Sequence, residues 1–168
     1  MKTSISYKKI VIEIIGSLYI LLFVYAALSK LLDFQNFRSQ IGLSPLLSSF
    51  ADYVSVGVIV LEIGISLLLF VPKFRLIGLY GSFSLMVMFS TYIFLILNYS
   101  SFIPCSCGGI LEKMGWQQHL VFNIIFVLLS GIGIIVVRPR SYFRKSLYTL
   151  VLITMASIGI VALLYLLS

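Results

Sequence analysis

Five long apolar stretches dominate the chain, and short polar segments separate them. They cover about residues 10–32, 53–71, 76–98, 117–137 and 146–167. Each is close to the ~20 apolar residues that an α-helix needs to cross the hydrocarbon core of a bilayer. The pattern therefore predicts an all-α membrane protein, with five transmembrane helices in a single domain that spans residues 1–168.

The composition fits a chain that lies mostly in lipid. Hydrophobic residues make up 61% of the sequence and charged residues 10%, whereas soluble domains are about half apolar and about a quarter charged. These values exclude a disordered chain and an ordinary soluble enzyme. The net charge of +7 does not indicate a nucleic-acid partner, because the charges are sparse and scattered between the apolar stretches. Membrane lipid is the expected partner.

Basic residues between the stretches predict the orientation. Nine of the twelve fall on one side of the predicted spans: Lys2, Lys8, Lys9, Lys73, Arg75, Arg138, Arg140, Arg144 and Lys145. The other side has only Lys30, Arg38 and Lys113. The positive-inside rule then predicts that the N-terminus lies in the cytoplasm and the C-terminus outside. Residues 33–52 and 99–116 become two outward-facing loops.

The first outer loop carries a helical pattern. Phe34, Phe37 and Ile41 recur at the spacing of one helix face, and Gly42 and Pro45 end that pattern. We therefore expect a short helix that lies on the outer surface of the membrane. Its role is either to anchor the loop in the lipid interface, to cover the second outer loop or to dock a partner.

Both cysteines of the chain lie in the second outer loop, separated by a single residue. The topology places Cys105 and Cys107 outside the cytoplasm, where disulfides form and persist. A bridge between them needs a turn, which Pro104 before the pair and Gly108 and Gly109 after it can supply. Such a small ring is strained, and strained, exposed disulfides are the labile and catalytic kind. The pair therefore favours redox exchange, with metal ligation and inert thiols as the alternatives.

The only histidine, His119, stands near the start of the fourth span, soon after the cysteines. Asn123 is four residues further on, so the two share a helix face, and Trp116 is placed as an interface anchor. His119 beside a thiol would act as a base or charge partner that favours the thiolate. The alternative is an interfacial histidine that is hydrogen-bonded to Asn123 or to the backbone.

Cys105, Cys107 and His119 also form a three-ligand set for Cu(I) or Zn(II), but no fourth ligand is evident and we expect no metal.

Glu62 lies in the middle of the second span. A carboxyl at that depth is costly unless it is protonated or paired, so it marks a functional site. We expect it either to relay protons during an exchange between thiols and a quinone, or to form a bond between helices in its protonated form. At the outer end of the first span, Lys30 and Asp33 stand three residues apart, a spacing at which they can pair at the interface.

Two groups of motifs carry a family resemblance. The first comprises residues 29–37 (SKLLDFQNF), 42–45 (GLSP) and 61–64 (LEIG), and the second comprises residues 104–109 (PCSCGG) with Trp116, His119 and Asn123. Together they resemble the DoxX-like superfamily of small membrane proteins, and within it the MauE (methylamine-utilisation) branch. The resemblance covers the first four spans. It implies a DoxX-like four-helix transmembrane bundle, to which this chain adds a fifth, C-terminal transmembrane helix.

The resemblance also implies a function and a place in the cell. MauE is implicated in maturing a disulfide-rich periplasmic subunit, and other relatives are linked to quinone-coupled sulfur oxidation or accompany thioredoxin-like proteins. The likeness implies that Cys105 and Cys107 are the redox pair and that His119, Asn123 and Glu62 support it. The predicted site therefore has Cys105, Cys107 and His119 as catalytic residues, and its supporting residues are Asn123, Glu62, Lys30, Asp33 and Trp116. The implied location is the bacterial cytoplasmic (inner) membrane, with the cysteine loop facing the periplasm.

Three functions remain open at this point. In the first, the cysteine pair exchanges disulfides with a periplasmic thioredoxin-like or other cysteine-containing protein, and electrons pass to or from a quinone. In the second, the protein is a non-catalytic membrane anchor or assembly subunit of an envelope complex, and the cysteine loop is a docking element. In the third, the protein binds a soft metal.

Overall fold

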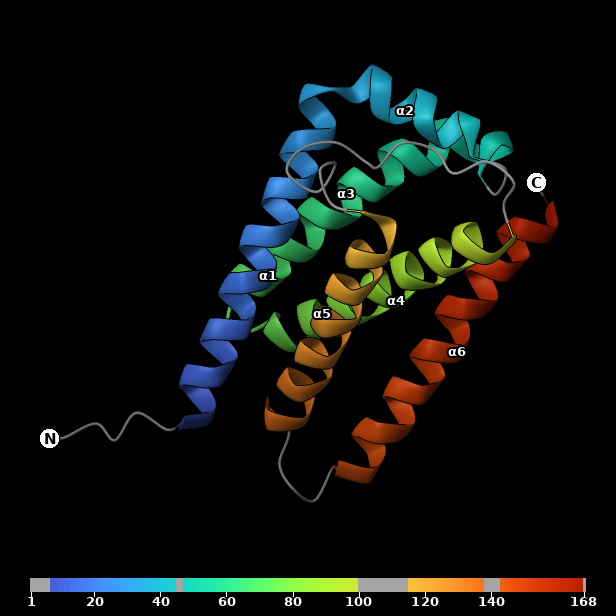
Figure 1. Cartoon of the computed structure of the whole chain (residues 1–168). Coiled ribbons are helices and arrows are strands. Elements are labelled where there is room, and N and C mark those ends of the chain that lie inside the picture. Colours follow the sequence, from blue (N-terminus) through green and yellow to red (C-terminus); the bar gives the residue numbers. More distant parts are fainter. Residues whose placement is uncertain (1–6, 45–46, 100–114, 138–142, 168) are drawn as a thin grey trace, which may run out of the picture.

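The structure is a computed structural model that describes residues 7–44, 47–99, 115–137 and 143–167, and the regular structure in these ranges is helical. The elements follow the order α1 (Tyr7–Leu32), α2 (Phe34–Leu43), the short 3-10 helix η1 (Ser48–Phe50), α3 (Ala51–Phe70), α4 (Arg75–Tyr99), α5 (Trp116–Val137) and α6 (Phe143–Leu167). Figure 1 shows them gathered into one bundle, in which α1 begins and α6 ends at opposite ends.

Five helical segments are long and apolar enough to cross a membrane: α1, η1 with α3, α4, α5 and most of α6. They are the five predicted spans, and the helix ends differ from the predicted ends by at most three residues. Their outward faces are apolar, since Leu21, Phe70 and Leu152 are between 69% and 74% exposed. Apolar surface on this scale is unusual for a protein in water and is the natural contact surface for lipid. The protein is therefore a multi-pass membrane protein.

Small residues let the spans approach each other closely, as in other membrane bundles. The tightest approach is at Gly78 of α4, where a Cβ atom would lie 2.8 Å from two side-chain carbon atoms of Leu69 in α3. At Gly133 of α5, a Cβ atom would lie 3.4 Å from Leu79 of α4. Larger residues at these positions would push the helices apart.

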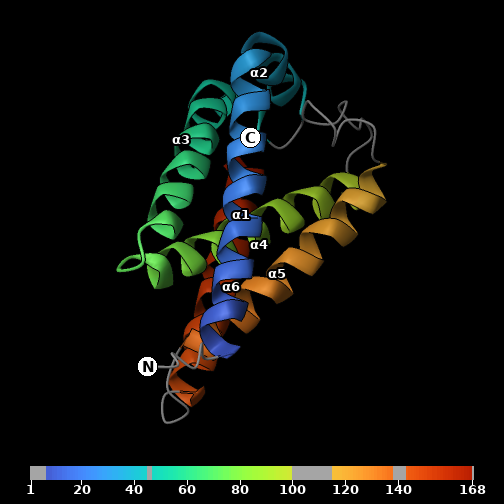
Figure 2. The same ribbon diagram turned by 90° about the vertical axis from the view of Figure 1, so that its left-hand side faces the viewer.

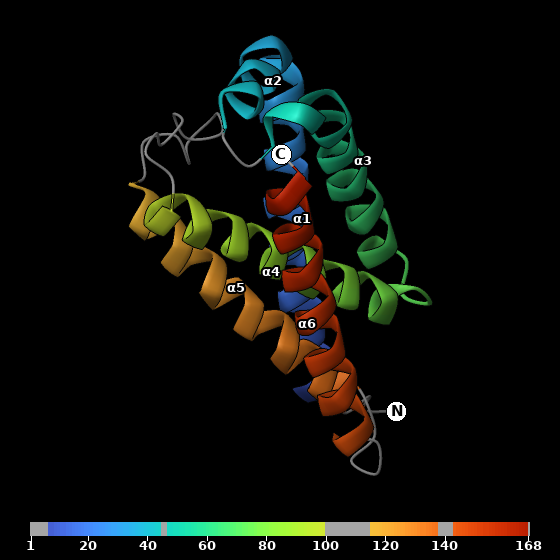
Figure 3. The ribbon, with the colours of Figure 1, turned by 90° about the vertical axis from the view of Figure 1, so that its right-hand side faces the viewer.

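α4 has a central position in the bundle. It packs against α3, α5 and α6, while α1 packs against α3 and α5. Figures 2 and 3 show α4 running obliquely across the bundle, with α1 on one side of it and α6 on the other. Residues of α4 therefore contribute to any space that the other spans enclose.

α2 and η1 lie across one end of the bundle (Figure 1). α2 is the short helix that the first outer loop predicts, and it buries Phe37 and Ile41, which are 5% and 6% exposed. Ser44 after it has an extended backbone, as expected for a residue that precedes a proline. α1, α4 and α6 finish at this end, and α3 and α5 begin there. We call it the α2 end.

Candidate functional site

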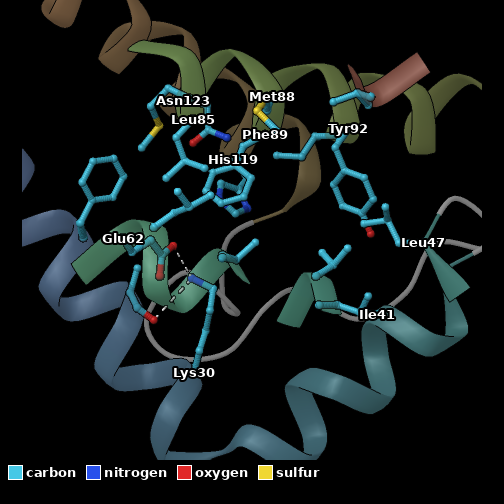
Figure 4. Close-up of a pocket in the computed structure, with 18 of the residues that line it drawn as sticks. Lys30, Ile41, Leu47, Glu62, Leu85, Met88, Phe89, Tyr92, His119 and Asn123 are labelled. Atoms are coloured by element: carbon cyan, nitrogen blue, oxygen red, sulfur yellow. Dashed lines mark hydrogen bonds and ion pairs between the residues drawn. The ribbon is translucent and has the colours of Figure 1, made fainter. Parts of the chain in front are cut away.

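A cavity of about 170 Å³ lies inside the α2 end of the bundle. Its wall is mostly apolar, with Phe23, Ile41 and Phe89 among its members, and every α-helix contributes to it. The acidic, basic and amide side chains in this wall are Lys30, Glu62, His119 and Asn123. Figure 4 shows Lys30 and Glu62 on one side of the cavity and His119 and Asn123 on the opposite side.

Lys30 and Glu62 form a buried ion pair between α1 and α3. The Nζ atom of Lys30 donates to Oε1 of Glu62 at 2.7 Å and to the backbone carbonyl of Ala26 at 3.4 Å. Glu62 is fully buried, and Lys30 is 8% exposed. A buried ion pair adds little net stability over apolar residues of the same size. Its presence within the spans of a membrane protein therefore points to a functional role.

α5 brings three of the predicted site residues to the cavity on one helix face. Trp116, His119 and Asn123 follow each other at intervals of three and four residues, so they lie above one another along the helix, and all three line the cavity. The rings of Trp116 and His119 stack with their centroids 6.4 Å apart. Asn123 is only 2% exposed. This face of α5 is therefore the wall opposite the ion pair.

Three buried polar atoms at the cavity have no hydrogen-bond partner among the described residues: Oε2 of Glu62, Nδ1 of His119 and Nδ2 of Asn123. Buried polar groups are nearly always hydrogen-bonded, and leaving one unpaired costs about 1–3 kcal/mol. The carboxylate oxygen is an acceptor, and the amide nitrogen is a donor. The cavity is therefore suited to a mostly apolar molecule that carries a few oxygen atoms able to accept or donate hydrogen bonds.

The predicted pair between Lys30 and Asp33 is wrong. α1 ends at Leu32, and Asp33 follows it with φ −124° and ψ 49°. Lys30 is buried against Glu62, whereas the exposed Asp33 accepts a hydrogen bond from Nδ2 of Asn36 at 3.0 Å. The charged partner of Glu62 is thus the lysine of the preceding span.

Cys105 and Cys107 lie outside the described residues, within the segment 100–114. The described chain stops at Tyr99, the last residue of α4, and α5 then begins at Trp116. Because Trp116 lines the cavity, the segment that carries both cysteines joins α5 at the cavity wall. The three-ligand metal set includes both cysteines and therefore also lies partly outside the described residues.

Tyr92 is a cavity residue that the sequence does not single out. It lies in the wall on α4, and its hydroxyl donates to Oγ of Ser44 at 3.0 Å, which ties α4 to the end of α2. The chain has ten tyrosines, so one more in an apolar stretch carries no signal of its own. Ile41, by contrast, could be found, because the helical spacing of the first outer loop already places it on the apolar face.

Sequence comparison adds independent information to this geometry. A profile of the methylamine utilisation protein MauE matches residues 8–136. The chain belongs to the MauE family. The MauE match runs from the second residue of α1 to the last but one of α5, so it includes Lys30, Glu62, His119 and Asn123. Neither a curated protein nor a solved structure matches the chain.

α6 lies outside the MauE match and still contributes to the cavity. Val161 and Leu164 line its wall, and the hydroxyls of Ser157 in α6 and Ser84 in α4 share a hydrogen bond at 2.9 Å. In this MauE-family protein, the additional span is therefore part of the wall around the candidate site.

Proposed function

We propose that the protein is a thiol–disulfide redox component of the membrane. Cys105 and Cys107 exchange disulfides with an extracytoplasmic protein and pass the electrons to a quinone in the cavity. One observation carries this proposal: Glu62, His119 and Asn123 present unpartnered polar atoms at an apolar cavity, and that cavity adjoins the start of α5, where the cysteine segment is attached.

The distribution of charge supports an orientation with the α2 end in the periplasm of a bacterial cell. At the opposite end, the helices begin or turn at Lys8, Lys9, Lys73, Arg75, Arg144 and Lys145. At the α2 end, Lys30 is paired with Glu62, and Arg38 is paired with Asp52 at 2.5 Å. Positive charge is therefore concentrated away from α2, and the positive-inside rule puts the N-terminus in the cytoplasm and the C-terminus outside. In this arrangement α1, α3, α4 and α5 form the DoxX-like bundle, and α6 is the added span.

The exchange is proposed to run in the oxidising direction. A thiolate of the partner attacks a Cys105–Cys107 disulfide and forms a mixed disulfide, and the partner's second thiolate then displaces the cysteine. The partner leaves oxidised, and Cys105 and Cys107 remain as a dithiol. A Cys-x-Cys ring is small and strained, and strain raises the oxidising power of a disulfide, so electrons are expected to flow toward the membrane.

The cavity has the size and polarity to hold the ring of a quinone. An engineered cavity of about 150 Å³ takes up benzene, and this one measures about 170 Å³. The carbonyl oxygens of a quinone accept hydrogen bonds, which Asn123 is placed to donate, and a hydroquinone donates them, which Glu62 is placed to accept. Leu61 lines the cavity and is 49% exposed on the outer surface of α3. An isoprenoid tail would therefore reach lipid at this point.

Trapping of the partner tests the exchange. Cys105→Ser and Cys107→Ser variants are expressed in the native host, quenched with acid and analysed on non-reducing gels with mass spectrometry. Because the exchange is reversible, the cysteine that a single variant retains can attack the disulfide of the oxidised partner. We expect one of the variants to accumulate a reducible adduct with one extracytoplasmic cysteine protein, because the second cysteine, which would release the partner as a dithiol, is missing. The double variant is the control and should give no adduct.

Two results would overturn the proposal. If neither single variant gives an adduct and the double variant keeps full function, the protein is an anchor or assembly subunit, and its complex should survive the loss of both cysteines. If the purified protein contains stoichiometric copper or zinc that Cys105→Ser removes, the loop is a soft-metal site.

A further inference from the structure

The proposed quinone chemistry, on which this inference rests, requires protons within the membrane. When the dithiol of Cys105 and Cys107 is oxidised, two S–H bonds break and one S–S bond forms, which releases two electrons and two protons. The quinone takes up two electrons and two protons to form the two O–H bonds of a hydroquinone. The thiols belong to an outer loop, whereas the ring would lie among the spans. The protons therefore need a route from the outer surface to the cavity.

A second, small cavity lies on the α2 side of Lys30. Its volume is about 10 Å³, which is close to the room that one water molecule needs. It is lined by Ser29, Lys30, Asp33, Asn36, Phe37 and Gln40. The exposed carboxylate of Asp33 accepts from Asn36 at 3.0 Å, and Oδ1 of Asn36 accepts from Nε2 of Gln40 at 3.2 Å. The Oε1 atom of Gln40 is buried without a partner in the described part of the chain, so this small cavity offers a water molecule an unsatisfied acceptor.

Lys30 is the polar residue that lines both cavities, and Phe37 is the aromatic residue that does so. The Nζ atom of Lys30 lies 2.7 Å from Oε1 of Glu62, and the other carboxylate oxygen, Oε2, is unpartnered. The ring of Phe37 lies 5.7 Å from the same Nζ atom. Lys30 therefore connects the small cavity, which Asp33 also lines, to Glu62 at the main cavity. The ring of Phe37 lines both spaces as well.

We propose that these groups form the proton route to the bound quinone. The Lys30 ammonium passes a proton to the Glu62 carboxylate, and Glu62 gives it to an oxygen of the reduced ring. A water molecule in the small cavity, held by Asp33 and Gln40, then returns a proton from outside to Lys30. A second passage supplies the second proton. After each passage Lys30 is again an ammonium and Glu62 a carboxylate, so the only net change is the transfer of a proton to the ring.

Two substitutions distinguish a proton route from an ion pair that only holds α1 and α3 together. Glu62→Gln keeps an oxygen that accepts from Lys30 but removes the group that carries the proton. Asp33→Asn alters the outer end of the route at an exposed position. Asp52→Asn is the matched control, because Asp52 is also an exposed acid at the α2 end, pairs with Arg38 and lines neither cavity.

The test uses the whole chain in phosphatidylcholine vesicles, with dithiothreitol as electron donor and a short-chain ubiquinone as acceptor. The double cysteine variant gives the background rate. Quenching of Trp116, the only tryptophan and a cavity residue, reports quinone binding separately from turnover. We expect Glu62→Gln to bind the quinone as the wild type does but to lose about 100-fold in turnover. Asp33→Asn should lose less and recover with added formate, and Asp52→Asn should turn over at the wild-type rate.

Failure of the route and failure of the proposed function give different results. If the wild type passes no electrons to ubiquinone, the proposed function is wrong and the route with it. If the wild type is active and both Glu62→Gln and Asp33→Asn keep its turnover and its solvent deuterium isotope effect, the route is overturned and the proposed function stands. If Glu62→Gln does not fold, an unchanged rate and isotope effect in Asp33→Asn are enough to overturn the route.

Discussion

The two halves of the bundle differ in how closely they are packed around the polar groups that they bury. In the half away from α2, which we call the closed half, Tyr19 is fully buried, and its hydroxyl donates to the backbone carbonyl of Phe126. The hydroxyl of Ser82 donates to the carbonyl of Gly78 at 2.9 Å. Close contacts accompany these bonds, because Gly78 leaves no room for a Cβ atom beside Leu69. The closed half is thus a packed core in which these two hydroxyls find partners within the bundle. The buried hydroxyl of Ser146, near the start of α6, has no partner among the described residues, but it lines neither cavity.

The half at the α2 end encloses a cavity instead. There Glu62 and Asn123 are as deeply buried as Tyr19, yet each carries a polar atom without a partner in the described structure. Burial alone therefore does not explain the difference. The closed half is closely packed, whereas the unpaired polar atoms of the α2 end belong to residues that line a cavity, where a ligand can use them. The predictions below test this contrast, and they run from the largest expected change in the free energy of unfolding to the smallest.

The largest loss of stability is expected from Glu62→Leu. This change leaves Lys30 buried without a counter-charge, which costs about 3–5 kcal/mol. The double variant Lys30→Met with Glu62→Leu should recover most of that loss, because an apolar pair replaces the ion pair. Unfolding in detergent, followed by circular dichroism, measures both. A double variant as unstable as Glu62→Leu would show that the ion pair itself holds α1 to α3.

The next largest effect is expected from Gly78→Ala in the closed half. The added methyl group would lie 2.8 Å from carbon atoms of Leu69, and overpacking of this kind costs about 1–3 kcal/mol. Gly64→Ala is the matched control, because its Cβ atom would meet nothing within 4 Å and alanine favours a helix by about 0.5–1 kcal/mol. The same unfolding assay compares them. Equal stability of the two variants would contradict the close packing of α3 and α4.

Tyr19→Phe is expected to cost about 0.5–1.5 kcal/mol, because it removes one satisfied hydrogen bond from the closed half. Its quinone affinity should stay that of the wild type, since Tyr19 does not line the cavity. Unfolding and Trp116 fluorescence together measure the two quantities. A loss of quinone affinity without a loss of stability would mean that the two halves are not separate in function.

Asn123→Leu is expected to change stability least. It replaces a buried amide whose nitrogen has no partner in the described structure with an apolar side chain of similar size, and such a change is close to neutral or stabilising. Quinone affinity should fall, because the donor to the ring is lost. Asn123→Leu changes the side chain more than Tyr19→Phe does, yet we expect it to cost less free energy of unfolding. A clear loss of stability in Asn123→Leu would refute the idea that its amide is kept for a ligand.

The sequence predicts the spans well because each is a property of one continuous segment. Any stretch of about 20 apolar residues has the length to cross the bilayer as a helix, so α1 and α3 to α6 follow without knowledge of their neighbours. α2 could be predicted for the same reason, from the spacing of Phe37 and Ile41. Glu62 was also recognisable, since a lone carboxyl within an apolar span stands out in the sequence alone.

The features that the sequence does not predict depend on contacts between segments that are far apart in the chain. Lys30 and Glu62 are 32 residues apart, and the local pattern offers Asp33 as the nearer partner for Lys30. The partner of Lys30 comes from α3, and the packing of α1 against α3 cannot be read from the residues. The cavity was also unpredictable, because it forms only where faces of six helices meet. Helical spacing predicts that His119 and Asn123 share a face of α5, but it does not predict that this face lies opposite Glu62.

Binding of a quinone to the cavity is the most direct test of the central claim. Trp116 is the only tryptophan and lines the cavity, so its fluorescence reports this site alone. In a titration with a short-chain ubiquinone in phosphatidylcholine vesicles, which contain no other protein, we expect saturable quenching for the wild type. The binding curve should weaken by about tenfold or more in Asn123→Leu, since a lost hydrogen bond to a ligand is worth on the order of 1.5 kcal/mol, and it should be unchanged in Asp52→Asn. Linear quenching that never saturates and is the same in all three proteins would contradict the account.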